Sequence, residues 1–561
     1  MKRVISLMLL VCSIGFLVDA QEPVRPKVTM TTKKAIGQTI SFNIQSKSAI
    51  AIEVDYGDGV LVRHQLDRTI VKVEGTVKGP NIGIYGPSIT YLACNSNSLT
   101  ALDVSKSTEL VQLNCSFNEL TALDVSNNTA LKFFDCNQNK LTALDVSNHT
   151  WLESINCAQN QLSTLNISGN TSLTHLYCFS NKLTTLNASS NTALKLLECH
   201  TNLLTALNVS NSTALTKLQC YKNQLTALDL SGNALLNVLS CGNNKLTTLD
   251  VSNCTALTVL DCAFNELTTF DASSNTALQL FNGYQNKLTA LNVSGCTLLE
   301  HLNCDTNQLT TLNVSGNLLL RLLICDNNQL TNLDLSVNTA LKILYCTNNQ
   351  LTVIDIPNNT TLAELTCENN QLSLATLPLA QSAGYYTYAP QADFKIAENI
   401  SVGQPIDLSA QSTVDGNITS FVWFTRGGTT LIEGTDYEIT NGITTFLQAQ
   451  TDAVYCRMTN VSFPDFTRKG VLKTTLAKVS VVTTINDQTA SSSIKIYSGD
   501  KSIVVQTEVE ARITVFDIYG RALAAERANK GHHTIHGISK GIYLVKVESN
   551  GVPFVEKVVV Q

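Results

Sequence analysis

The sequence has little charge and few of the patterns that mark enzymes. Only 15% of its 561 residues are charged, the net charge is −6, and its 8 histidines are scattered. No basic cluster with interleaved aromatics occurs, which argues against a nucleic-acid or polybasic membrane surface. HExxH, GxSxG, phosphate-loop and dinucleotide motifs are all absent. A carboxylate pair for glycoside hydrolysis stays open, although nothing marks one out. We expect neither an enzyme nor a cofactor.

Long hydrophobic runs are missing except at the start of the chain. Residues 1–20 have a basic head, an apolar run and a small residue at Ala20, which predicts a signal peptide cut before Gln21. The run is too short to remain as a membrane span, and no later segment is apolar enough to cross a bilayer. Cys12 suggests a lipoprotein site, but Val11 fits poorly before a lipidated cysteine. We therefore expect export from the cytoplasm and no transmembrane segment.

The sequence does contain one 21-residue unit that is repeated fourteen times between residues 89 and 377. In its frame, LxxLxCxxNxLxxLDVS, cysteine is missing only at Gly283, and an asparagine follows three residues later in every copy. A period this strict is the signature of a solenoid, and the frame is that of a leucine-rich repeat. Two-residue alternation points the leucines and cysteines inward. Stacked copies then extend a parallel sheet along the concave face.

The repeated polar and sulfur positions have structural interpretations. A buried asparagine must be hydrogen-bonded, so we expect that column to satisfy backbone groups in neighbouring coils. The cysteines form no CxxC pair and point the same way, which favours buried thiols over a metal site or disulfides. Where Gly283 removes volume, we expect Phe270 and Phe281 to refill it. The DVSxNT segment predicts turns without helices on the convex side.

The modules on either side of the repeats are predicted to be β-rich. Residues 21–88 are expected to cover the exposed apolar edge of the first coil. Their YGDG segment resembles a turn of PKD-type β modules and is interpreted as a hairpin turn, although Asp55 and Asp58 leave a calcium site open. After the repeats, short alternating strands with Trp423 and Cys456 predict an immunoglobulin-like β-sandwich that lacks its first cysteine.

The last module carries three blocks in a fixed order, VFDIYGR (515–521), GIYLVKV (541–547) and KVVVQ (557–561). They resemble the C-terminal sorting domain of type IX-secreted proteins of Gram-negative bacteria, which gingipain proteases also carry. The usual opening YPNP is replaced by YSGD at 497–500, which blurs the start of the domain. The resemblance implies recognition by type IX secretion machinery, passage across the outer membrane, removal of the domain and attachment to the cell surface. Three histidines here could suggest metal ligands, but we interpret them as strand-edge residues: His532, His533 and His536.

The repeats resemble those of bacterial internalins, in particular the internalin J-like proteins, whose 21-residue units carry cysteine in the same inward column. The resemblance implies a surface protein that binds host or neighbouring-cell molecules, with the sandwich as a spacer. We therefore expect a mainly β protein built around a leucine-rich-repeat solenoid. Its expected segments are a signal peptide (1–20), a β-rich cap (21–88), the solenoid (89–377), a connecting seam (378–390), an immunoglobulin-like sandwich (391–483), a linker (484–493) and the sorting domain (494–561).

Positions that flank each cysteine vary between copies, and they line the concave sheet. In copies five to seven they are rich in aromatic and charged residues, which is the composition of binding hot spots. The alternative is that outward aromatics are ordinary sheet residues favoured by β-propensity. The candidate ligand-binding residues are His175, Tyr177, Phe179, Glu198, His200, Lys217 and Tyr221, with Tyr284 and Tyr345 in a second, weaker cluster.

Two functions follow from these features. The first is a surface adhesin that binds a host or bacterial surface protein or glycan through the concave face, without a cofactor and without nucleic acid. The second is a structural surface or biofilm component whose solenoid serves only as a spacer. The concave residues separate the two, because only an adhesin loses binding when they are replaced.

Overall fold

The computed structural model describes residues 27–86, 88–356, 361–379, 383–481, 494–499, 501–549 and 552–560. The expected signal peptide and linker lie outside these ranges. The chain divides into two compact units, Met1–Ala392 and Asp393–Gln561. Both are built from β-strands, and the only helical elements of the described residues are short 3-10 turns at Ser409–Gln411 and Pro464–Thr467. The prediction of a mainly β protein is confirmed.

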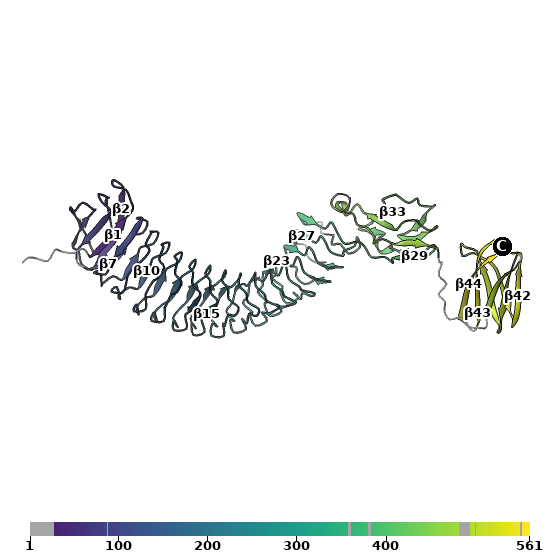
Figure 1. Cartoon of the computed structure of the whole chain (residues 1–561), viewed down its shortest axis with the longest axis horizontal. Helices are drawn as coiled ribbons and strands as arrows, with labels where there is room; N and C mark the ends of the chain where they lie inside the picture. The colour runs from purple at the N-terminus through teal and green to yellow at the C-terminus, as the bar shows by residue number, and fades with distance from the viewer. Residues whose placement is uncertain are drawn as a thin grey trace, which may run out of the picture. The chain divides into compact units, whose positions relative to one another are not determined.

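The repeats form a solenoid in which each coil adds one short strand to a continuous parallel sheet (Figure 1). The sheet starts at β7 (Ile89–Ala93) and reaches β27 (Glu364–Thr366). Partner residues in consecutive strands are 21 positions apart, as in Leu176 opposite Leu197. The strands between are β9 (Gln112–Asn114), β10 (Phe133–Asp135), β11 (Ser154–Asn156), β12 (His175–Tyr177), β14 (Leu196–Glu198), β16 (Lys217–Gln219), β17 (Val238–Ser240), β18 (Val259–Asp261), β20 (Leu280–Asn282), β22 (His301–Asn303), β23 (Leu322–Ile324) and β25 (Ile343–Tyr345).

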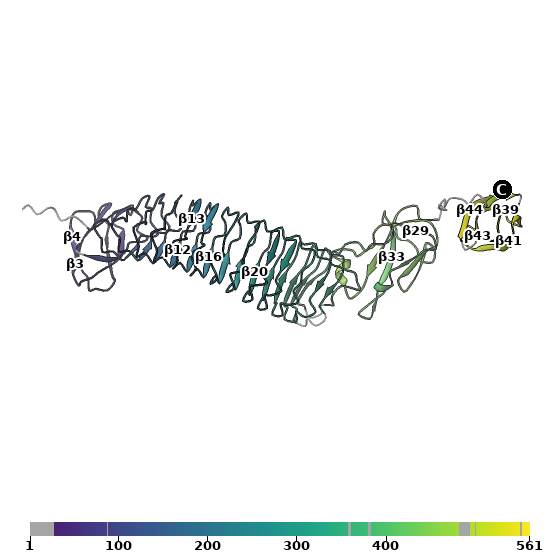
Figure 2. The same cartoon turned by 90° about the horizontal axis from the view of Figure 1, so that it is seen from below.

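The opposite side of each coil is a turn that only locally becomes a strand (Figure 2). Since 21 residues leave little room for a helix, the segment after each LD pair closes through Asx turns, as at Asp145, whose Oδ1 accepts from the Ser147 N–H at 2.9 Å. Short outer pairs occur at three places: β13 (Thr185–Asn187) with β15 (Ala206–Asn208), β19 (Thr269–Asp271) with β21 (Ala290–Asn292), and β24 (Leu333–Asp334) with β26 (Ile354–Asp355).

The asparagine column forms an inner ladder, defined by the residues at 21-residue intervals from Asn97 to Asn370. Asn118 is representative. Its Nδ2 donates to the carbonyls of Cys94 at 3.1 Å and Cys115 at 3.0 Å. Its Oδ1 accepts from the Asn97 and Leu99 N–H groups, both at 3.0 Å. One side chain thus joins two coils through both its donor and its acceptor, as the sequence predicts.

The cysteines of the repeats are buried and form no disulfides. Burial raises the pKa of the Cys94 thiol to about 12, so it stays protonated and behaves as a small hydrophobe. At the one interruption, a Cβ on Gly283 would lie 2.5 Å from Phe281 Cε1. Phe281 packs on Phe270 with ring centroids 5.1 Å apart. The two phenylalanines therefore occupy the volume that the missing cysteine leaves, as expected.

A second buried polar column, the outer ladder, lies under the convex turns. Asn128, the first asparagine of this column, donates from Nδ2 to the carbonyls of Val104 at 3.0 Å and Ser107 at 2.8 Å. The sequence does not predict this ladder, because its members change from coil to coil. They are Asn128, His149, Asn170, Asn191, Ser212, Asn233, Cys254, Asn275, Cys296, Asn317 and Asn338.

The segment expected to be a connecting seam (378–390) instead contains a fifteenth strand, β28 (Tyr385–Thr387), which pairs in parallel with β27. The buried Tyr388 stands in the cysteine column. Gln391 stands in the asparagine column and copies its bonds, because Nε2 donates to the Cys367 carbonyl at 2.8 Å and Oε1 accepts from the Leu372 N–H at 3.2 Å. The residue types change while the coil geometry continues.

The N-terminal module extends both sides of the first coil. Its β2 (Thr39–Ser46) pairs with β7 and with β5 (Val71–Thr76). Its β1 (Val28–Thr32) pairs with β8 (Leu99–Asp103), an outer strand of the first coil. The remaining strands are β3 (Ala51–Asp55), β4 (Leu61–Gln65) and β6 (Asn81–Tyr85). This arrangement covers the edge of the solenoid, which is the role expected of a cap.

The first part of the second unit packs around Trp423, which is fully buried. Its Nε1 donates to Thr444 Oγ1 at 3.1 Å, and its ring lies edge-on to Phe446 at 5.0 Å. Cys456 lies opposite Trp423 in the strand pairing and is a buried, free thiol. The strands are β29 (Asn399–Ser401), β30 (Pro405–Asp407), β31 (Thr413–Val414), β32 (Asn417–Ile418), β33 (Ser420–Thr425), β34 (Tyr437–Thr440), β35 (Ile443–Phe446), β36 (Val454–Thr459) and β37 (Lys478–Ser480).

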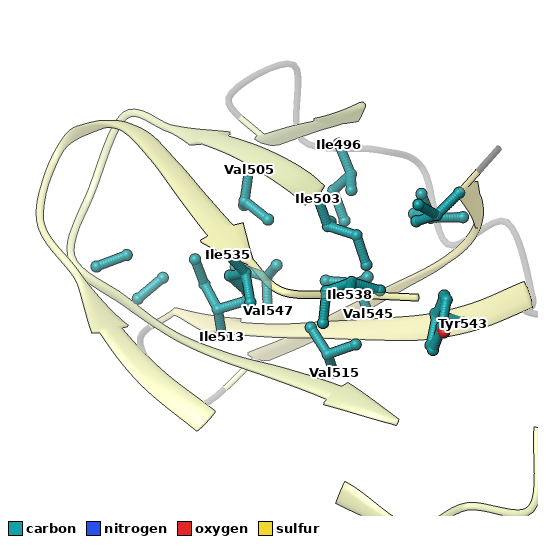
Figure 3. Close-up of a cluster of buried hydrophobic side chains, with 14 residues drawn as sticks. Ile496, Ile503, Val505, Ile513, Val515, Ile535, Ile538, Tyr543, Val545 and Val547 are labelled. Atoms are coloured by element: carbon teal, nitrogen blue, oxygen red, sulfur yellow. The ribbon is translucent and has the colours of Figure 1, made fainter. Parts of the chain in front are cut away.

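The last module is a two-layer β-sandwich. A three-stranded sheet consists of β38 (Ile494–Gly499), β39 (Ser502–Thr507) and β42 (Gly531–His536), and a four-stranded sheet has the order β41 (Ala522–Ala528), β40 (Ala511–Phe516), β43 (Gly541–Ser549), β44 (Val552–Val560). Side chains such as Ile503, Val515 and Val545 fill the space between the sheets (Figure 3). The three histidines of this module all lie on β42, at the edge of the three-stranded sheet, where they pair with residues of β39.

Candidate functional site

The residues predicted to bind a ligand come from three positions of the repeat. Two are the outward-pointing ends of the strand of the main sheet, as His175 and Tyr177 are on β12. The third directly follows the cysteine, as Phe179, His200 and Tyr221 do. The parallel register places each such residue beside its counterpart in the next coil.

The central feature is a stack of three aromatic rings from consecutive coils, which we call the ring stack (Phe179, His200 and Tyr221). The Phe179 and His200 centroids are 4.6 Å apart with ring planes 12° from parallel. The His200 and Tyr221 centroids are 4.2 Å apart at 7°. Because neighbouring strands are roughly 4.8 Å apart, equivalent flat side chains come into face-to-face contact. All three rings are half-buried.

Charged side chains border the ring stack. Lys217 Nζ and Glu198 Oε1 form an ion pair at 2.9 Å. Partial burial lowers the pKa of His200 below its ordinary value, although Glu198 opposes that shift. The imidazole is therefore neutral at pH 7. Burial also raises the pKa of the Tyr221 phenol. The site thus presents uncharged rings beside a paired cation and anion, a combination that suits recognition.

Tyr284 and Tyr345 do not join the ring stack. Tyr284 lies three coils beyond Tyr221 and packs edge-to-face with Phe264 at 4.6 Å between centroids. Tyr345 lies three coils further and donates from its hydroxyl to Glu364 Oε2. The structure therefore brings together the candidates of copies five to seven, and leaves the second cluster as separate contacts.

Beyond the aromatic coils, the position after the cysteine becomes acidic, with Asp305, Asp326 and Glu368. Burial raises the pKa of Asp326 to about 6, and the Asp305 and Glu368 carboxylates add to that shift. Asp326 Oδ1 accepts from the Thr347 N–H at 2.5 Å. The sequence did not point to this acidic stretch, because its residues differ in chemistry from the aromatic residues that occupy the same repeat position in earlier coils. No group of three potential ligands in the described part of the chain is placed to hold a metal ion.

The carboxylates of the YGDG turn have structural partners. Asp55 Oδ1 accepts from the N–H groups of Gly57 at 2.8 Å and Gly59 at 2.9 Å. Asp58 Oδ2 lies 2.8 Å from Lys78 Nζ, and this hydrogen bond lowers the pKa of the Asp58 carboxyl. Both oxygens thus serve the turn, which supports its interpretation as a hairpin turn.

Comparison with known families and structures gives two matches of consequence. Residues 484–561 match the family model of the secretion system C-terminal sorting domain. The structure is similar to the functional domain of InlJ from Listeria monocytogenes, which includes a cysteine ladder, with 32% identity, a TM-score of 0.53, and coverage of 70% of this chain and 90% of that one.

A further solved structure, YopM from Yersinia enterocolitica, matches with 24% identity, a TM-score of 0.43, and coverage of 56% of this chain and 72% of that chain. No curated protein matches the sequence significantly. Within the described residues, the structure contains no helix that is both long and apolar enough to span a membrane.

Proposed function

Because the chain belongs to the internalin J-like family of cysteine-ladder leucine-rich-repeat proteins and carries a secretion sorting domain, we propose that it is a bacterial surface adhesin. The family and the sorting domain support a secreted surface protein. The proposal adds that the solenoid binds a host or neighbouring-cell protein or glycan on its concave face. Export by type IX secretion, followed by surface attachment, is the route that the sorting domain supports.

The observation that carries the proposal is the ring stack, together with the Glu198–Lys217 pair. Half-exposed aromatics that are held rigid by a sheet contribute large contact area without much loss of side-chain entropy on binding. The leucines and cysteines behind the sheet already form the core. The outward rings are therefore not required to complete it, and they remain available to a ligand.

The test is binding of the purified protein to panels of host glycoproteins, glycans and neighbouring bacterial cells. We expect a variant with Phe179→Ala, His200→Ala and Tyr221→Ala to bind its ligand at least about 100-fold more weakly, since central aromatic anchors each contribute roughly 2 kcal/mol or more. Substitution of Lys217 by Ala should have a smaller effect, because its ion pair is partly solvated.

The matched control is Phe264→Ala with Tyr284→Ala, an aromatic pair on the same sheet but outside the ring stack. Thermal melts establish that each variant is folded. Equal loss of binding affinity in both variants would indicate that the ligand contacts the whole concave face and not the ring stack alone. Unchanged binding in the ring-stack variant would contradict the proposed site, and the absence of any ligand for the unmodified protein would favour the spacer function.

A further inference from the structure

The two outer faces of the C-terminal sandwich differ in character. On the three-stranded sheet, residues that point away from the core are mostly polar, including Gln506, His532 and Thr534. On the four-stranded sheet, one end of the outer face is apolar. We call this end the apolar patch; its members are Phe516, Ile518, Tyr519, Leu523, Ile542, Leu544 and Val559.

Strand register brings these residues together. Ile542 lies opposite Val559, and Phe516 lies opposite both Leu544 and Ala522. Their neighbours along the strands point to the core, as Val515 and Tyr543 do in Figure 3. Val558 on β44 also belongs to this core. By strand alternation Phe516, Ile542, Leu544 and Val559 therefore face outward, at the end of the sheet next to the β40–β41 turn that holds Ile518 and Tyr519.

Five of the seven side chains are strongly exposed, and Phe516 and Leu544 are partly exposed. The exposed fractions are 75% for Tyr519, 55% for Ile518, 51% for Leu523, 50% for Val559 and 44% for Ile542. Single exposed apolar residues are ordinary, but a contiguous group on one end of a sheet marks an interaction surface.

The turn that holds Ile518 and Tyr519 is firmly built. Asp517 Oδ1 accepts from the N–H groups of Tyr519 and Arg521, both at 2.9 Å. Asp517 Oδ2 accepts from Arg521 Nε at 2.7 Å, and Gly520 supplies the positive φ of 79° that the turn needs. Asp517, Gly520 and Arg521 thus hold the backbone, while Ile518 and Tyr519 extend from it without joining the core.

We propose that the apolar patch is the surface by which a protein component of the secretion machinery recognises this domain. The match to a secretion sorting domain requires such a partner. The patch is bordered by one exposed cation, Lys557, which lies opposite Leu544. The partner surface is therefore apolar at its centre and acidic at its rim.

The test compares full-length variants in a host with type IX secretion. One variant carries Tyr519→Ser, Ile542→Thr and Val559→Thr, in which threonine keeps β-branching and strand preference. The control carries Tyr497→Ser and Val504→Thr on the other outer face. Surface display and periplasmic retention are measured by cell fractionation, and protease resistance of the purified proteins reports folding.

We expect the patch variant to fold, to collect in the periplasm and to lose surface display by about tenfold or more, because loss of central apolar contacts weakens an interface by that order. The control should be displayed normally. A charge reversal, Lys557→Glu, should also reduce display, because it places an anion against the acidic rim of the partner.

Normal display of a folded patch variant would overturn the proposal, as would equal loss in the patch variant and the control. Binding of the purified protein to lipopolysaccharide vesicles that depends on the patch, with display unchanged, would assign the patch to a lipid surface instead. None of these outcomes depends on ligand binding by the solenoid, which is measured separately.

Discussion

Each coil of the solenoid contains two buried polar positions, one behind the main sheet and one under the convex turn. At the inner position every coil from Asn97 to Asn370 has asparagine. At the outer position the equivalent residue is asparagine in most coils but His149, Ser212 or Cys254 in others. Both positions are buried and both connect neighbouring coils, so burial alone does not explain why only one of them varies.

The difference lies in how many hydrogen bonds each position must make. Inner asparagines use both ends of the amide, as Asn118 does. The outer asparagines Asn128, Asn170 and Asn233 use only the Nδ2 group, and their Oδ1 atoms have no hydrogen-bond partner among the described residues. A position that needs only a hydrogen-bond donor tolerates other residue types that can donate. Ser212 Oγ donates to the Ala188 carbonyl at 2.9 Å, and Cys296 Sγ to that of Ala272 at 3.2 Å.

The largest expected effect is at the inner ladder. Asn202→Ala would leave the Leu183 N–H without its partner. The carbonyls of Cys178 and Cys199 would each lose one of two donors and keep the one from the ladder asparagine of an adjacent coil. Since an unpaired buried group costs about 1–3 kcal/mol and each further lost hydrogen bond roughly 1 kcal/mol, we expect the free energy of unfolding to fall by about 3 kcal/mol. Chemical denaturation measures this change. A loss below about 1 kcal/mol would show that water replaces the amide and that the ladders do not differ as described.

An intermediate effect is expected where the inner cysteine column is interrupted. Although Gly283→Cys restores the repeat sequence, its Cβ would lie 2.5 Å from Phe281 Cε1. We expect a loss of about 1–3 kcal/mol from overpacking, visible as a lower melting temperature. Combining it with Phe281→Leu, the residue type of the neighbouring coils, should recover most of that loss. A clear gain in stability from Gly283→Cys alone would contradict this account.

The smallest effect is expected at the outer ladder. Asn233 donates to the carbonyls of Val209 at 3.2 Å and Ser212 at 3.0 Å. Asn233→Ser keeps a donor, as Ser212 does naturally, so we expect a loss of at most about 1 kcal/mol. The matched comparison is Asn223→Ser in the inner ladder, where we expect a larger loss in the same denaturation experiment. Equal losses would remove the distinction between the ladders.

The sequence predicts the features in which residue type and role coincide. The cysteines and inner asparagines recur as the same residue type every 21 positions, so the sequence shows both columns directly. The filling of space beside Gly283 by Phe270 and Phe281 follows from side-chain volume. The sequence does not predict the outer ladder, because asparagine, serine, histidine and cysteine share only a donor. The coil that contains Tyr388 and Gln391 is missed for the same reason. Its buried position and its hydrogen bonds are those of the other coils, but different residue types provide them.

Backbone strain is also hidden from the sequence. The second residue after each cysteine position has a positive φ in every one of the fourteen coils, and none of these residues is glycine. Phe117 (φ 54°) and Gln159 (φ 53°) are examples. Left-handed conformation normally favours glycine or asparagine. The stacked coils impose it here, because it turns the next residue, the inner asparagine, toward the core.

For the candidate site, the repeat register predicts which residues are neighbours, and hence the grouping of Phe179, His200 and Tyr221. It does not predict that their rings stack, because side-chain rotamers depend on contacts beyond the strand. It also places Tyr284 and Tyr345 on the same sheet without showing that each packs with a partner of its own.

The pairing of β2 at one end and β28 at the other has a consequence for the reach of the protein. Every coil offers the same hydrogen-bonding edge to the next, so a unit inserted or deleted between the two ends leaves both closures intact. Each unit of 21 residues changes the length of the sheet by one strand spacing, roughly 4.8 Å. The distance between the two ends of the repeat array can therefore change in uniform steps, while the strand pairings at both ends stay the same.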